Sequence, residues 1–147
     1  MPHTIQLHRV FAAPADRIYR AFLDAPALAR WLPPNGFTGT VHDLDARVGG
    51  RYRMSFTNFT TGNGHSFGGE YLELVPGQRI AYTGEFDAEE LAATMTTTVR
   101  LTQVSCGTEM HITQEGIPDM IPAEQCHLGW QQSLAHLATL VETEIPD

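Results

Sequence analysis

The chain has 147 residues, the length of one domain that can bury a core without a metal or disulfide to hold it together. Its 17 acidic and 9 basic residues give a formal charge of -8, which disfavours nucleic acid and anionic membranes as partners, since both attract basic surfaces. Cys106 and Cys126 form no spaced ligand set, so we expect reduced thiols in a cytoplasmic protein. Met1 to Val10 lacks the basic start and apolar core of a signal peptide, and no apolar run approaches the ~18 residues of a membrane span.

The N-terminal part of the chain predicts one strand followed by two short helices. His3 to Phe11 alternates as a strand does. Pro14 then opens a first short helix, and Pro26 opens a second that ends near Trp31. A Pro-Pro-Asn-Gly run at residues 33–36 breaks the helical pattern, so the sequence changes character at this point.

The middle of the chain predicts six strands, because its apolar residues recur with a period of two. Turn-forming residues, mostly glycines with proline or asparagine beside them, separate the runs and favour an antiparallel meander. The expected strands are Phe37 to Leu44, Gly50 to Phe59, Ser66 to Val75, Arg79 to Gly84, Thr94 to Val104 and Thr108 to Gln114.

The closing segment, Ile121 to Val141, predicts one long amphipathic helix. Pro122 suits its first turn, where a missing N–H costs nothing. Gly129 costs about 1 kcal/mol relative to alanine inside a helix, so we expect it to mark close approach to a neighbouring strand, with the floor of a pocket as the alternative. The face expected to be buried carries Cys126, Trp130, Leu134, Leu137 and Val141.

Four segments carry a resemblance to a known family: Asp45 to Arg53, Gly69 to Thr83, Gly107 to Met110, and Gly129 with Trp130. They resemble the SRPBCC superfamily, and within it the branch named after an activator of the ninety-kilodalton heat-shock chaperone's ATPase. The resemblance covers nearly the whole chain and implies a single domain over residues 1–147. It implies an α+β helix-grip fold, in which a curved antiparallel sheet of about seven strands, with two short helices after the first strand, holds a long C-terminal helix over a cavity. In related branches this cavity holds lipids, polyketides, hormones or other apolar molecules.

The leading interpretation is a binding module that encloses a hydrophobic small molecule between sheet and helix. Aromatic residues and methionines on the expected inner faces would form an adaptable wall. If Leu72 and Leu74 face inward, strand parity puts Glu70 on the same wall, whereas a one-residue bulge would reverse its facing. The expected ligand-binding residues are Trp31, Tyr52, Met54, Phe56, Glu70, Tyr82, Met95, Met110, Gln114 and Trp130.

Two other functions stay open. The first is a cyclase- or isomerase-type enzyme, in which burial raises the pKa of a pocket carboxyl such as Glu70 toward neutrality, with Tyr82 or His65 as further acid or base candidates. The second is a chaperone-interacting regulatory protein, which only the family's name suggests. Because the chain accounts for one domain, this interaction is disfavoured. The oligomeric state is left open, a homodimer included.

The histidines predict no local metal site. The 7 of them include no H-x-x-x-H pair, and His127 and His136 on the final helix do not lie on adjacent turns of one face. A site assembled from distant strands is the remaining alternative. We therefore expect neither a metal nor another cofactor.

Overall fold

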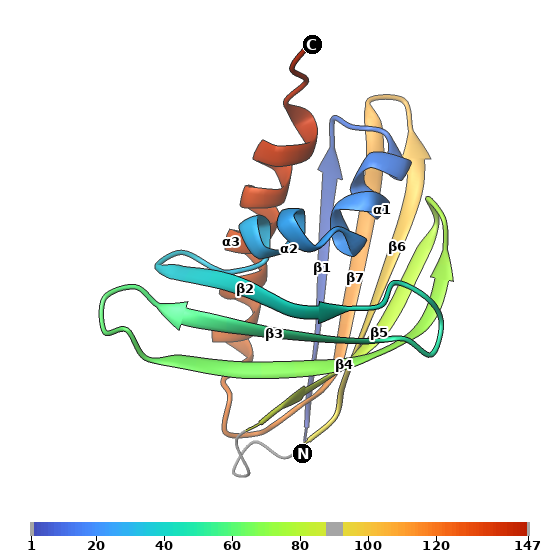
Figure 1. Ribbon diagram of the computed structural model, residues 1–147. Helices are drawn as coiled ribbons and strands as arrows, with labels where there is room; N and C mark the ends of the chain where they lie inside the picture. The colour runs from blue at the N-terminus through green and yellow to red at the C-terminus, as the bar shows by residue number, and fades with distance from the viewer. Residues whose placement is uncertain (1, 88–92, 147) are drawn as a thin grey trace.

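The computed structural model describes residues 2–87 and 93–146, which form a curved antiparallel sheet and three helices (Figure 1). The elements in chain order are β1 (His3–Phe11), α1 (Ala15–Leu23), α2 (Ala25–Trp31), β2 (Phe37–Leu44), β3 (Arg51–Asn58), β4 (Gly64–Val75), β5 (Arg79–Phe86), β6 (Met95–Val104), β7 (Gly107–Ile117) and α3 (Ala123–Glu142). This is the α+β helix-grip architecture that the resemblance implied.

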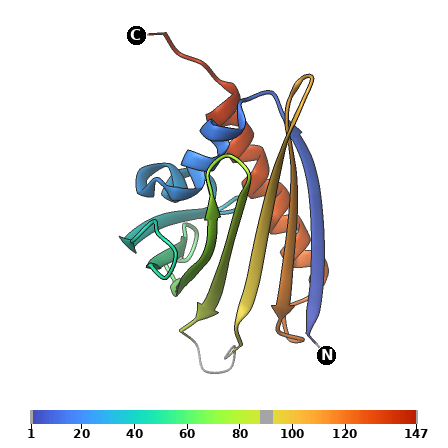
Figure 2. The ribbon, with the colours of Figure 1, turned by 90° about the vertical axis from the view of Figure 1, so that its right-hand side faces the viewer.

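The seven strands have the order β1-β7-β6-β5-β4-β3-β2, and every neighbouring pair is antiparallel. Strands β2 to β7 therefore form the expected meander, and β1 joins its far edge by pairing with β7. In Figure 1 β1, β6 and β7 run upright while β2, β3 and β4 run across them, so the sheet is strongly twisted. Figure 2 shows α3 lying along one face of this sheet, as the sequence predicted.

Glycines at the turns adopt the conformation that the sequence pattern requires. Gly49, Gly62 and Gly77 have φ angles of 84°, 79° and 71°, in the left-handed region that favours glycine. One detail of the sequence prediction is wrong: Pro122 is the N-cap of α3 rather than part of its first turn. Its backbone is extended, with φ -60° and ψ 135°, so the helix begins one residue later.

The core follows the inner face of the sheet, and one tightly packed part of it lies between α3 and strands β1, β6 and β7. Phe11, Ile112 and Leu137 are at most 1% exposed, and Val141 is 2% exposed. At the C-terminal end of α3, the Arg17 guanidinium of α1 donates to the Val141 carbonyl over 2.9 Å. The helix is thereby fixed against one half of the sheet. No helix among the described residues is long and apolar enough to span a membrane.

Candidate ligand-binding cavity

A cavity of about 310 Å³ lies between α3 and the inner face of strands β2 to β7, with α1 and α2 contributing to its wall. The wall is mostly aromatic and aliphatic. Its polar side chains are hydroxyls, amides, one thiol and one imidazole, and no aspartate, glutamate, lysine or arginine among the described residues lines it. The volume is at the lower end of the ~300–1,000 Å³ that small-molecule pockets occupy.

Seven of the ten expected ligand-binding residues line this cavity. They come from β3, β5, β6, β7 and α3. The remaining three, Trp31, Glu70 and Met110, do not line the cavity. The seven are Tyr52, Met54, Phe56, Tyr82, Met95, Gln114 and Trp130.

Trp31 and Met110 belong to the core instead, which corrects their expected place on the wall. Trp31 is fully buried, its indole N–H donates to the Ala21 carbonyl over 2.9 Å, and its ring meets Phe22 edge-on at 4.7 Å. Met110 is 1% exposed on β7, within the packed half of the sheet. Neither side chain lines the cavity. Both side chains are apolar and point inward. They differ from the wall residues only because neighbouring side chains cover them.

Glu70 lies on the outer face of β4, which corrects the expectation that it faces inward. It pairs in register with Arg51 of β3, and its carboxylate lies 3.9 Å from the Arg51 Nη1. Its side chain is 44% exposed. The cause is a register shift between Tyr71 and Glu73, a bulge that makes Leu72 an exposed extra residue. Parity counted back from the C-terminal end of β4 is therefore reversed before the bulge.

Tyr71 replaces Glu70 as the inward residue of β4, and sequence reasoning missed it for the same reason. Its ring packs with Tyr52 at 5.6 Å and with Tyr82 at 6.3 Å. The Tyr52 hydroxyl donates to the Thr83 carbonyl over 2.7 Å. Burial raises the pKa of Tyr71 to about 12 and also raises the pKa values of Tyr52 and Tyr82. All three phenols are therefore neutral hydrogen-bonding groups at physiological pH.

A hydrogen-bonded chain of side chains crosses from α3 to the sheet. The Trp130 indole donates to the Gln114 Oε1 over 3.1 Å, and the Gln114 Nε2 donates to the Thr97 Oγ1 over 3.2 Å. Thr97, which is 2% exposed, also hydrogen-bonds the Tyr82 side chain. This chain pairs the polar side chains of Trp130, Gln114 and Thr97 and fixes the orientation of the Trp130 ring. The Tyr82↔Thr97 pairing that places Thr97 here could not be read from the sequence.

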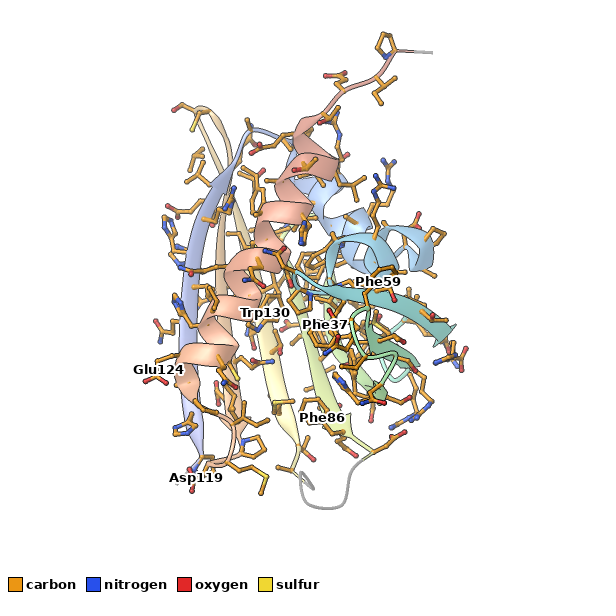
Figure 3. All side chains as sticks on the ribbon, turned by 90° about the vertical axis from the view of Figure 1, so that its left-hand side faces the viewer. Phe37, Phe59, Phe86, Asp119, Glu124 and Trp130 are labelled. Atoms are coloured by element: carbon orange, nitrogen blue, oxygen red, sulfur yellow. The ribbon has the colours of Figure 1, made fainter. Side chains whose placement is uncertain are left out.

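His65 belongs to an aromatic group in the wall of the cavity. Its ring lies 5.8 Å from Phe56 and 5.9 Å from Phe86, although the residue is exposed. Desolvation lowers the pKa of His65, so the imidazole is neutral at pH 7. In Figure 3 Phe37 and Trp130 lie between α3 and the β2 side of the sheet, with Phe86 further toward the end of β5. Aromatic rings thus form much of this part of the wall.

Gly129 lies on the cavity-facing side of α3, which makes the pocket-floor alternative correct and the predicted close approach to a strand wrong. A Cβ built on Gly129 would meet no atom within 4 Å, whereas one on Gly69 would lie 1.9 Å from the Thr83 carbonyl oxygen. Close strand approach is therefore a property of Gly69. The missing side chain at Gly129 leaves space that the cavity includes.

A helix-grip fold that encloses an aromatic cavity is the class that these observations define. The chain belongs to the family described as Activator of Hsp90 ATPase homolog 1-like protein, whose model matches residues 12–142. The resemblance to this branch of the SRPBCC superfamily is thereby confirmed. No curated protein matches the chain at a significant level.

Solved structures share this fold over almost the whole chain. A crystal structure of a protein from Chromobacterium violaceum is 60% identical, with a TM-score of 0.96, and the match covers 98% of this chain and 100% of that one. A protein from Rhizobium loti is 26% identical, with a TM-score of 0.77 and coverage of 95% and 96%. One from Rhodobacter sphaeroides, 20% identical with a TM-score of 0.81 and coverage of 93% and 90%, shows the fold alone.

Proposed function

We propose that the protein binds an uncharged, largely apolar small molecule in the cavity between the sheet and α3. The observation that carries the proposal is the wall itself: about 310 Å³ of space bordered mostly by aromatic and aliphatic side chains, with no aspartate, glutamate, lysine or arginine among its described residues. A charged ligand would lose its hydration there without gaining an ion partner, which costs several kcal/mol. An apolar ligand gains about 25 cal/mol for each Å² of apolar surface removed from water.

The Tyr71 hydroxyl supplies one directional contact for such a ligand. Tyr71 lines the cavity and is 3% exposed. Its raised pKa keeps the proton on the oxygen. The ligand that fits best therefore carries an acceptor such as a carbonyl oxygen within an otherwise apolar skeleton.

Binding of Nile red, a neutral dye whose fluorescence depends on its surroundings, tests the proposal. We expect saturable binding of one dye per chain, reversed by competing uncharged apolar ketones. The decisive variant is Gly129→Leu, whose side chain enters the space beside α3 and removes binding. It should also raise stability, since glycine costs about 1 kcal/mol in a helix interior. Loss of binding together with a gain in stability cannot result from misfolding.

Gly129→Ala is the matched control, because it gives the same gain in helix propensity while adding only one methyl group to the cavity. It should keep most of the dye affinity. Dye binding that is unsaturable in the natural chain, or equal in Gly129→Leu and Gly129→Ala, contradicts the proposal. A ketone whose affinity falls in Tyr71→Phe while that of a hydrocarbon of the same shape does not would support the polar contact.

The other two functions have less support. An acid–base mechanism based on Glu70 would lack a carboxylate in the cavity, because the Glu70 side chain lies on the outer face of the sheet. The remaining candidates, Tyr82 and His65, line the cavity as neutral groups without a charged partner in the described wall. A chaperone-regulating role rests on the family's name. Both cysteines are free, which suits a reducing compartment, and we propose the cytoplasm as the site of action.

A further inference from the structure

Three side chains with metal-ligating atoms come together on the outer face of the sheet, on the side opposite the cavity. His8 lies on β1, and Glu109 and His111 lie two residues apart on β7. Because His8 pairs in register with His111, all three project from the same face. One ligand atom from each lies within 4.8 Å of the other two. The residues between them on β7, such as Met110, point into the core.

Both imidazoles turn the same nitrogen toward the carboxylate. The His8 Nε2 lies 3.0 Å from the Glu109 Oε2, and the His111 Nε2 lies 3.2 Å from the Oε1. The ring centroids are 4.6 Å apart. Protons on the two nitrogens hold the group together in this arrangement. A cation placed between them could replace both protons and meet three ligand atoms at once.

The strand pair positions these ligands before any ion arrives. Neighbouring antiparallel strands are rigid at this point, since pairing between β1 and β7 is continuous from Ile5 to Phe11. The side chains of His8 and His111 are each 51% exposed and that of Glu109 is 34% exposed. An ion can therefore enter from solvent, and water can complete its coordination.

The set of donors selects the class of ion. Two imidazole nitrogens with one carboxylate suit Zn²⁺ and neighbouring divalent transition metals, whereas Mg²⁺ and Ca²⁺ require mostly oxygen ligands. We propose that His8, Glu109 and His111 form a binding site for a divalent transition-metal ion of the Zn²⁺ type, with water in the fourth position.

One neighbouring charge opposes the ion. Arg100 on β6 pairs in register with His111, so its guanidinium belongs to the same outer face and repels a cation bound there. The repulsion is partly screened at physiological ionic strength. Arg100 therefore provides a way to change the affinity without touching a ligand.

Calorimetric titration of the full chain with ZnCl₂ tests the site. We expect one ion per chain with no change in the mass of the protein particle in light scattering. His8→Ala and His111→Ala should each lower the affinity about ten-fold or more, because two ligands hold the ion far less firmly than three. The matched control is His42→Ala, which removes an exposed histidine from β2, the opposite edge strand. Its affinity for Zn²⁺ should equal that of the natural chain.

Two further measurements decide between this site and nonspecific binding. Arg100→Gln should raise the Zn²⁺ affinity about two- to three-fold through the lost repulsion. MgCl₂ should give no saturable heat. The proposal is overturned if His8→Ala and His42→Ala bind Zn²⁺ equally, or if the ion binds at half an equivalent while the particle mass doubles. Nile red affinity should be the same in His8→Ala and the natural chain, which separates this site from the cavity.

Discussion

Side chains alternate in the same way in the two halves of the sheet, but one half is tightly packed and the other borders the cavity. In the half formed by β1, β6 and β7, inward residues such as Phe11, Val99 and Ile112 are at most 1% exposed, because α3 and the short helices pack on them. In the half formed by β3, β4 and β5, inward residues such as Phe67 and Tyr82 border open space. The alternation of side chains therefore indicates which face of the sheet is covered. It does not indicate whether the covering helices contact that face or leave a cavity.

The twist of the sheet produces the difference. Strands β2, β3 and β4 turn across the direction of β1 and β7 (Figure 1), so a straight helix that packs on one half stands away from the other. The bulge in β4 and the close β4–β5 contact at Gly69 add local irregularity on the open side. Large rings fill part of the gap, and the cavity is what they leave.

The largest expected effect is on a methionine of the packed half. Met110→Ala should lower the free energy of unfolding by about 2–5 kcal/mol, because the surrounding core cannot collapse onto the lost side chain. Urea titration measures it. Leu128→Ala, at a position 54% exposed on α3, is the control and should change stability by less than about 0.5 kcal/mol. An equally small effect at Met110 would remove the distinction between the two halves.

Alkaline pH should weaken the protein through the tyrosines of the open half. The unfolded chain releases the Tyr71 proton above pH 10.0, whereas the folded chain holds it until about 12, so its contribution to stability is complete below pH 10.0 and is lost through that window. The total is about 2–3 kcal/mol, since each pKa unit corresponds to about 1.4 kcal/mol. Urea titrations at pH 9 and 11 should show a smaller loss in Tyr71→Phe. Equal losses would mean that the folded environment does not retain this proton.

Met95, at the start of β6, borders the cavity and should matter less than the fully covered Met110. Met95→Ala should cost about 1 kcal/mol or less, because its side chain already borders the cavity and its removal forms less new empty surface. The same urea titration measures it, and Nile red should still bind. If Met95→Ala costs as much as Met110→Ala, the space beside Met95 is filled and the cavity does not reach β6.

The smallest expected effect comes from His65 at acid pH. Desolvation lowers its pKa in the folded state, so below about 6.5 the unfolded chain takes up a proton that the folded chain resists. Stability should therefore fall as pH decreases through the range below 6.5. His65→Gln should make this decline shallower in unfolding titrations at pH 7 and 5, whereas His42→Gln should not. An unchanged slope in His65→Gln would contradict the desolvation of its ring by Phe56 and Phe86.

The order and type of the elements could be predicted because local signals determine them. Alternation fixed the bounds of β1 and β2 at the residues the structure shows, and glycines such as Gly49 and Gly77 marked turns that need a positive φ. The spacing of apolar residues also predicted the long helix, and the resemblance added its placement over a cavity. The strands, turns and helices depend on residues that are close in sequence, which is why the sequence alone could predict them.

The wall of the cavity could be predicted only in part, since it depends on pairing and distance. The bulge at Leu72 reversed the facing of Glu70 and concealed Tyr71. Trp31 and Met110 are as apolar as the true wall residues, but other side chains cover them. Gly129 is also ambiguous, because glycine in a helix serves close packing and open space alike. Each error concerns what lies opposite a residue rather than the residue itself.

The pairing of the first strand with the last has a consequence for the order of folding. His8 meets Glu109 across a sequence separation of 101 residues, whereas β2 to β7 pair with strands adjacent in the chain. Closing so long a loop costs entropy that local hairpins do not face. Because β1 precedes β7 in the chain, its native partner is synthesised only after β2 to β6. The two histidines and Glu109 can therefore meet only after β7 has been made.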